Sequence, residues 1–189
     1  MRRRHPLPRV WLMTDDRMGD ALWEALGRLP RGAGVIVRHY GSPMAERRAI
    51  LERVERIARR RGLIVLGAGG LVGSGGVHNA RARHGLRTQA AHDKAEIVSA
   101  MRIGADAVFV SPVFATRSHV GARGLGVVRF GLLVRGVRVP VIALGGMDAR
   151  RARRVAAVGV YGWAGIDAWS KTVRAPAPAG AQSGMPRRQ

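Results

Sequence analysis

The sequence predicts an α/β protein: a compact (β/α)₈ TIM barrel with weak or missing helices after the third and fourth strands. Two observations support this prediction. Short runs rich in β-branched residues alternate with amphipathic helical segments, which is the pattern of repeated βα units. There are eight such runs, the number that a closed parallel barrel requires. The alternative is an open, doubly wound sheet with fewer strands.

Each strand candidate is a short run of residues that favour extended backbone. The eight runs cover Val10–Thr14, Val35–Tyr40, Leu63–Leu66, Gly76–His78, Thr88–Ala91, Ala107–Val113, Val139–Leu144 and Gly162–Ile166. All of them fall within residues 1–170, which we interpret as one barrel domain. The basic, Pro-Ala-rich segment 171–189 is expected to be a disordered tail, because it lacks the apolar residues of a core.

Four helices are predicted between these strands. The clearest covers Met44–Arg60, where apolar residues recur at helical spacing among charges. The other three cover Asp20–Leu29, Lys94–Ile103 and Ala149–Val158. Asp93 and Asp148 are the expected N-caps of the last two, and Glu96 stands where a capping box would place it. Between strands three and five there are only the glycine-rich connection Gly67–Gly76 and a short turn, so no helix is predicted there.

The composition limits the classes of protein to consider. The chain has no cysteine, which excludes disulfides and thiolate sites and fits a cytoplasmic protein. It has no apolar stretch near the ~20 residues of a membrane helix, so no membrane is expected as a partner. Nothing in the sequence decides the oligomeric state, and a homo-oligomer stays open.

The net charge of +21 is carried almost entirely by arginine. A field of this sign attracts nucleic acid or phosphorylated small molecules. Aromatic residues make up only 5% of the chain, and no helix-turn-helix, zinc or RNA-binding motif is present. A solvated basic surface is therefore favoured over a nucleic-acid interface.

After the seventh predicted strand, Gly145 and Gly146 lead into a capped helix. Glycine has no Cβ, so main-chain N–H groups can approach an anion there, and the helix start adds a favourable dipole. Phosphate sites of such barrels are frequently built from the loops after strands seven and eight. Gly145 and Gly146, with Gly165 and Ile166 after strand eight, are therefore candidate phosphate-binding residues. A tight turn without a ligand would use the same glycine pair.

Two segments resemble one known family. Residues 104–116 read GADAVFVSPVFAT and residues 140–147 read PVIALGGM. Both are similar to segments of the thiamine phosphate synthase and thiazole tautomerase family, whose members are (β/α)₈ barrels. The resemblance spans the domain but is specific mainly in its second half. It implies phosphorylated thiazole and pyrimidine small molecules as partners.

The resemblance also implies roles for individual residues. Gly145 and Gly146 would hold the thiazole or product phosphate, helped by Thr116, and Arg38 would face the diphosphate. His92 stands after strand five, where the tautomerase branch carries a histidine. Histidine suits proton transfer because its ordinary pKa, about 6.5, lies near neutral pH. The candidate catalytic residues are therefore His92 and Arg38.

The sequence departs from the family where Mg²⁺ would bind. Leu66 and Gly67 replace the Asn-Asp pair in which the family's strand three ends, and Arg83 stands where a metal-binding aspartate is expected. Mg²⁺ is the cofactor that the resemblance implies, but its expected carboxylate ligands are absent, and no metal ligand is assigned. Asp167 stands beside the phosphate site, where an ionised carboxylate would repel the ligand.

The nominal function is that of the synthase, which joins hydroxymethylpyrimidine diphosphate to thiazole phosphate and releases pyrophosphate. Two alternatives follow from the missing carboxylates. One is a thiazole tautomerase using His92, because that reaction needs a proton shuttle and a phosphate grip but no such metal. The other is a non-catalytic binder of phosphorylated ligands. A basic nucleic-acid-binding protein is the least favoured hypothesis.

Overall fold

The computed structural model describes residues 7–81, 84–115 and 124–169. Within them, eight parallel strands pair in sequence order and close into a barrel, because the first strand also pairs with the last. The strands are β1 (Val10–Met13), β2 (Gly34–Val37), β3 (Ile64–Ala68), β4 (Gly76–His78), β5 (Leu86–Ala91), β6 (Ala107–Val110), β7 (Val141–Ala143) and β8 (Gly162–Gly165). The barrel prediction is confirmed, and the open doubly wound alternative is wrong.

The inside of the barrel is a packed core. Successive side chains of a strand point to opposite faces, so every second residue reaches the axis. The inner cluster includes Trp11, Ile36, Leu66, Phe109 and Ile142, each fully buried. The rings of Trp11 and Phe109 meet edge to face, with their centroids 5.2 Å apart. This core fills the barrel, so a ligand can enter only at an end of it.

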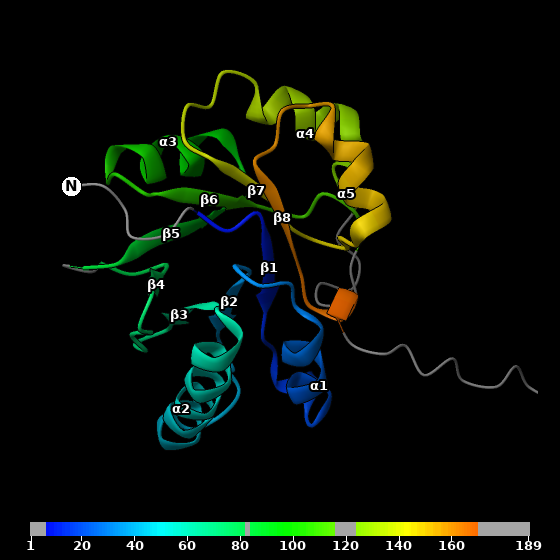
Figure 1. Ribbon diagram of the computed structural model, residues 1–189. Coiled ribbons are helices and arrows are strands. Elements are labelled where there is room, and N and C mark those ends of the chain that lie inside the picture. The colour runs from blue at the N-terminus through cyan, green and yellow to red at the C-terminus, as the bar shows by residue number, and fades with distance from the viewer. Residues whose placement is uncertain (1–6, 82–83, 116–123, 170–189) are drawn as a thin grey trace, which may run out of the picture.

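Helices cover the outside of the barrel in two groups on opposite sides of the strands (Figure 1). One group contains α1 (Ala21–Arg28) and α2 (Met44–Arg61), whose apolar faces bury one cluster against β1, β2 and β3. The other contains α3 (Lys94–Arg102), α4 (Gly126–Val134) and α5 (Ala149–Ala156), which bury a second cluster. Two short 3₁₀ helices, η1 (Asp16–Met18) and η2 (Asp167–Trp169), follow β1 and β8.

No helix lies between β3 and β5 in the part of the chain that the structure describes, as the sequence predicted. The connection from β3 to β4 instead lies directly against its own strand. A Cβ at Gly73 would stand 2.5 Å from the main-chain oxygen of Val65, and one at Gly67 would stand 2.5 Å from the main chain of Leu71. The N–H of Gly75 donates to the Val65 carbonyl over 2.8 Å. Glycine is required here because two backbones share the space that a helix and its side chains would fill.

Several predicted boundaries are wrong at the carboxyl ends of strands. The second strand ends at Val37 rather than Tyr40, because His39 turns the chain with a φ of 44°. The sixth ends at Val110 rather than Val113, before a cis peptide bond between Ser111 and Pro112. Helix α4 was not predicted at all. These early strand ends bring polar residues to the rim of the barrel.

None of the described helices combines the length and the apolar character that crossing a membrane requires. The predicted disordered tail, 171–189, lies outside the described residues, so that prediction stays open.

Candidate functional site

The carboxyl ends of the eight strands form one end of the barrel, which we call the mouth. Parallel pairing places every residue that follows a strand at this same end. Six of the seven candidate residues follow or end a strand there: Arg38, His92, Gly145, Gly146, Gly165 and Ile166. The seventh, Thr116, lies outside the described residues, as does Arg83. The structure therefore brings the six to one end of the barrel, and their roles stay predictions.

The Gly145–Gly146 turn packs tightly against the loop after β6. Both residues have left-handed φ values, 94° and 58°. A Cβ at Gly145 would stand 2.7 Å from Cα of Pro112, and one at Gly146 would stand 2.4 Å from the carbonyl oxygen of Ala115. Only glycine meets both demands, since other residues favour neither the φ nor the crowding. The tight turn that the sequence allowed is therefore present. Its presence does not exclude a phosphate site, which would use the same glycines.

The carbonyl groups of this turn accept hydrogen bonds from the protein, whereas its N–H groups bond to no described residue. The carbonyl of Gly145 accepts a hydrogen bond from the N–H of Phe114 over 3.1 Å. The carbonyl of Gly146 accepts one from Nη1 of Arg151. Neither glycine N–H donates to another described residue. The carbonyls are engaged while the amides stay available, which is the arrangement that an anion needs.

Arg151 is a residue that sequence reasoning missed. Its guanidinium carbon lies 5.1 Å from the centre of the Phe114 ring, a cation–π contact that joins α5 to the loop after β6. Asp148, the predicted N-cap of α5, accepts from the Arg151 N–H over 2.7 Å. A positive charge is thus fixed beside the glycine turn. Its position three residues after a predicted N-cap, on a helix starting at the mouth, was the available signal.

Arg38 follows β2, three strands from β7 around the barrel, and its side chain contacts the residues that follow β1. Its Nε donates to the Thr14 carbonyl over 3.0 Å, and Nη2 lies 3.2 Å from Oδ2 of Asp15. The side chain is only 19% exposed. Burial lowers the pKa of Arg38, against the opposing charge of Asp15, yet a guanidinium remains protonated at neutral pH. Arg38 is therefore a fixed cation at the mouth.

Asp15 serves two arginines. Its Oδ1 lies 2.6 Å from Nε of Arg17, in addition to the contact with Arg38. Burial alone would raise the pKa of the Asp15 carboxyl, but hydrogen bonds from Arg17 and the charges of both arginines hold it below its usual value. Asp167, which raised concern about repulsion, is exposed at the start of η2, and its charge helps to raise the pKa of Arg17. Asp15 and Asp167 thus both favour the charged form of Arg17.

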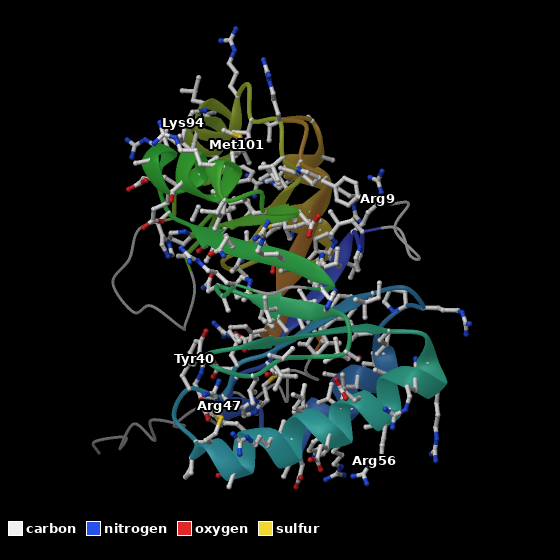
Figure 2. All side chains as sticks on the ribbon, turned by 90° about the vertical axis from the view of Figure 1, so that its left-hand side faces the viewer. Arg9, Tyr40, Arg47, Arg56, Lys94 and Met101 are labelled. Carbon is white, nitrogen blue, oxygen red and sulfur yellow. The ribbon has the colours of Figure 1, made fainter. Side chains whose placement is uncertain are left out.

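Arg47 of α2 hydrogen-bonds to the main chain at the carboxyl ends of two strands, and sequence reasoning missed it as well. It is 6% exposed and donates to three main-chain carbonyls, those of Arg38, Ala68 and Gly69, at 2.7 to 2.9 Å. Figure 2 shows Arg47 next to Tyr40 at the start of α2, with Arg56 pointing away from the barrel farther along the helix. The guanidinium carbon of Arg47 lies 5.4 Å from the Tyr40 ring centre. One buried side chain therefore ties the carboxyl ends of β2 and β3 together.

His92 lies between the ends of β5 and β6. Its Nδ1 lies 2.9 Å from the main-chain oxygen of Ser111, and its own N–H donates to Oε2 of Glu96 over 2.6 Å. A carbonyl oxygen can only accept, so Nδ1 carries the proton and Nε2 keeps its lone pair in the neutral ring. Nε2 has no hydrogen-bond partner among the described residues. The exposed ring thus offers one basic nitrogen at the mouth.

Below this rim lies His78, a buried histidine at the end of β4. It is 1% exposed; Nδ1 lies 2.9 Å from Oγ1 of Thr88, and the ring meets Phe109 edge to face. Burial, followed by the charge of Arg38, lowers the pKa of His78 to about 3. The ring is neutral at physiological pH and forms part of the floor of the mouth. Sequence reasoning assigned no functional role to His78.

The two positions where the family resemblance expects Mg²⁺ ligands, Leu66 and Gly67, carry no donor side chain. Among the described residues, no group of three His, Asp or Glu side chains could hold a metal ion. Leu66 points into the inner core, and Gly67 is covered by Leu71. Mg²⁺ prefers oxygen ligands in an octahedral arrangement, usually with carboxylates among them. These two positions within β3 therefore supply no ligand for it.

The opposite end of the barrel carries a separate surface hollow of about 360 Å³, between Arg9, Val137, Arg138, Val160 and Tyr161. These residues precede or begin β1, β7 and β8, so the hollow is not part of the mouth. In Figure 2, Arg9 and Tyr40 lie on opposite sides of the molecule.

Solved structures of similar fold include two thiamine phosphate pyrophosphorylases. The Pyrococcus furiosus protein superposes with a TM-score of 0.69 and 23% identity over 85% of this chain and 86% of that one. The Bacteroides thetaiotaomicron protein has a TM-score of 0.57 and 16% identity over 85% and 83% of the two chains. At these identities the likeness establishes the fold.

Sequence relatives agree with the fold. Thiamine-phosphate synthase of Salinispora tropica is 36% identical over 129 residues, 65% of this chain and 61% of that protein. The enzyme of Geobacillus thermodenitrificans is 33% identical over 98 residues, 50% and 42% of the two chains. These matches span less than two thirds of either relative. The thiamine monophosphate synthase family profile matches residues 72–169, more than half of the chain. With its closed eight-stranded barrel and its glycine turn after β7, the chain belongs to the thiamine monophosphate synthase family.

Proposed function

We propose that this protein is a thiamine phosphate synthase-like transferase that joins hydroxymethylpyrimidine diphosphate to thiazole phosphate. One observation carries the proposal beyond family membership. A glycine turn with available amides, at Gly145 and Gly146, and a partly buried guanidinium, that of Arg38, belong to the same barrel mouth. The reaction needs two such anion sites, one for each phosphorylated substrate.

The proposed chemistry assigns a task to each site. The ring nitrogen of the thiazole attacks the methylene carbon of the pyrimidine, so a C–N bond forms and the C–O bond to the diphosphate breaks. Pyrophosphate leaves with the electron pair of that bond. Arg38 stabilises the leaving negative charge, because a fixed cation interacts most strongly with charge that develops beside it. The amides of Gly145 and Gly146 hold the thiazole phosphate and so orient the attacking nitrogen.

The test is a coupling assay with purified protein and both phosphorylated precursors. We expect thiamine phosphate and pyrophosphate in equal amounts. An Arg38→Met variant should lose most of the rate, whereas Arg48→Met, which removes an exposed arginine of α2, should not. Absence of product from a folded wild-type protein would overturn the synthase proposal. Tight binding of thiamine phosphate without turnover would then favour the non-catalytic binder.

A second candidate is a thiazole tautomerase, and it is supported by the hydrogen bond between His92 and Ser111. Isomerisation of a phosphorylated thiazole carboxylate moves one proton, and a neutral ring with Nε2 unprotonated is suited to remove it. The same glycine turn would hold the phosphate. Incubation with this substrate should change its ring isomer, and His92→Ala should slow the change. An unaffected rate in that variant would remove His92 from the mechanism.

A further inference from the structure

The hollow at the amino ends of β1, β7 and β8 lies away from the mouth and has no task in the proposed function. Its volume of about 360 Å³ falls within the range of small-molecule sites. Its wall comes from the segment before β1 and from the connections that lead from α4 to β7 and from α5 to β8. A site here would therefore be separate from the one for the phosphorylated substrates.

One part of the wall is apolar. Val137, Val139 and Val160 line it, and all three are half-buried. Their inner sides pack against the core cluster that α4 and α5 cover. The core thus holds these side chains in place, and their exposed carbons form a fixed apolar surface. A ligand with an apolar group gains free energy by displacing water from this surface.

Arg9 supplies one charge of the wall, and its orientation is set by Tyr161. The guanidinium carbon of Arg9 lies 4.6 Å from the centre of the Tyr161 ring, and Nη1 donates to the Tyr161 carbonyl over 3.3 Å. The Tyr161 hydroxyl donates in turn to the Leu7 carbonyl over 2.7 Å, which fixes the ring. Nε and Nη2 of Arg9 bond to no described residue, so they can donate to a ligand.

Arg138 adds a second positive charge. It is exposed and makes no hydrogen bond or ion pair with any residue in the described part of the chain. The residues that line the hollow include no aspartate or glutamate, so nothing in the wall itself cancels the two charges. The N–H groups of Val139 and Val160 also donate to no described residue. An oxyanion suits these donors, because it offers several lone pairs together with the opposite charge.

We propose that this hollow binds a small organic oxyanion, a carboxylate or phosphate monoester whose apolar group lies against the three valines. Arg9 and Arg138 hold the charged end of the ligand. An amine is disfavoured by its charge, and a bare inorganic anion leaves the apolar part of the wall in water. The inference goes beyond the proposed function, since no residue of the mouth takes part.

The probe is benzoate, titrated into the isotope-labelled full chain while amide signals are followed by NMR. We expect saturable shifts at Val139, Val160 and Tyr161, with a Kd of about 1 mM or below, and unchanged signals at Gly145 and Gly146. Acetate has the charge without the ring and should bind about tenfold more weakly. Benzyl alcohol has the ring without the charge and should give no saturable shift.

Phenyl phosphate distinguishes the two kinds of oxyanion. If the hollow favours phosphate monoesters, phenyl phosphate will shift the same three amides with a lower Kd than benzoate, and if it favours carboxylates, with a higher one. Any shift at Gly145 and Gly146 reports binding at the mouth, with its own Kd.

Variants test the two arginines. Arg9→Met and Arg138→Met should each weaken benzoate binding about tenfold, the effect of losing one charge-assisted contact, and Arg9→Lys should recover part of the loss. Arg135→Met removes an exposed arginine at the end of α4 that does not line the hollow, and it should bind like the wild type. This control separates a site from the general field of a chain with a net charge of +21.

Three results would overturn the inference: shifts that do not saturate, benzoate and acetate binding alike, or Arg135→Met losing as much affinity as Arg9→Met and Arg138→Met. Thermal melts establish that each variant is folded, and Arg138→Met, at an exposed position, tests the site even if Arg9→Met is not. The outcome is distinct from that of the coupling assay. Thiamine phosphate formation without benzoate binding would remove this site and leave the synthase, and benzoate binding without product would do the reverse.

Discussion

Nδ1 of His92 lies 2.9 Å from the main-chain oxygen of Ser111, and this contact fixes which ring nitrogen carries the proton. The two residues follow neighbouring strands, β5 and β6, so the tautomer of His92 depends on the pairing of these strands rather than on its own loop. A main-chain acceptor cannot be removed by substitution, which makes the arrangement robust to changes at position 111.

The first prediction concerns this ring. His92→Asn places an amide N–H near the Ser111 carbonyl but has no basic nitrogen at the position of Nε2. We expect the proposed isomerisation to slow by about 10²- to 10⁴-fold, the usual contribution of one general base. Single-turnover kinetics measures this, with His84→Ala, an exposed histidine, as the control. A His92→Asn enzyme as fast as the wild type would show that the ring does not move the proton.

The glycine turn allows backbone strain to be separated from crowding. Gly146→Ala introduces a Cβ 2.4 Å from the Ala115 oxygen at a φ of 58°, whereas Gly136→Ala has a φ of 73° and nothing within 4 Å. The control should lose about 1 kcal/mol in free energy of unfolding, the cost of the left-handed backbone, and Gly146→Ala about 1–3 kcal/mol more. Urea unfolding measures both. Equal losses of unfolding free energy in the two variants would mean that the loop after β6 moves away from the new Cβ without a measurable cost in stability.

Arg47 should be among the most sensitive charged residues of the fold. Arg47→Met leaves three main-chain carbonyls without their donor at a side chain that is 6% exposed. We expect a loss of about 3–5 kcal/mol in unfolding free energy, as for a broken buried charge network. Arg56→Met, on the exposed side of the same helix, should change stability by less than about 0.5 kcal/mol. Denaturant titration would contradict the prediction if both variants lost the same amount.

His78 makes stability depend on pH. Its folded-state pKa of about 3 lies below the ordinary 6.5, so between these values the unfolded chain binds more protons than the folded one. Above pH 6.5 His78 is neutral in both the folded and the unfolded chain, and its titration costs the fold nothing. As the pH falls below 6.5, the free energy of unfolding decreases by about 1.4 kcal/mol per pH unit.

The variant His78→Gln isolates this effect. Its unfolding free energy between pH 6 and pH 4 should fall less steeply than that of the wild type, by about 1.4 kcal/mol per pH unit. His84→Ala, which removes an exposed histidine, should keep the wild-type slope. Identical slopes for His78→Gln and the wild type would place the pH dependence elsewhere.

The fold was predictable because its signals are local. Gly76–His78 was predicted with the correct bounds, and Asp93 and Asp148 cap their helices as expected. Glu96 departs slightly from the expected capping box, since its carboxylate accepts from the N–H of His92, one residue earlier. Caps and short strands depend on neighbours in sequence, which a pattern contains.

The missed features depend on residues far apart in sequence. Helix α4 contains a glycine and several β-branched residues, which disfavour a helix. It is stabilised instead by the packing of Phe130 and Val134 in the core. Arg47 bonds to a glycine 22 residues away, and Arg151 is recognisable only beside Phe114. The topology predicted the end of the barrel at which the candidate residues lie. It did not predict the contacts that each of them makes.

Among the described residues no helix follows β3 or β4, so this side of the barrel has no helical cover. There β3 packs against its own glycine-rich connection, residues 69–75, instead of a helix, and this connection gains much conformational entropy when it is released. Amide protons of β4 should therefore exchange with solvent through small openings that leave the helix-covered flanks intact. Because β4 ends in His78, whose ring forms part of the floor of the mouth, such openings would also change the shape of that floor.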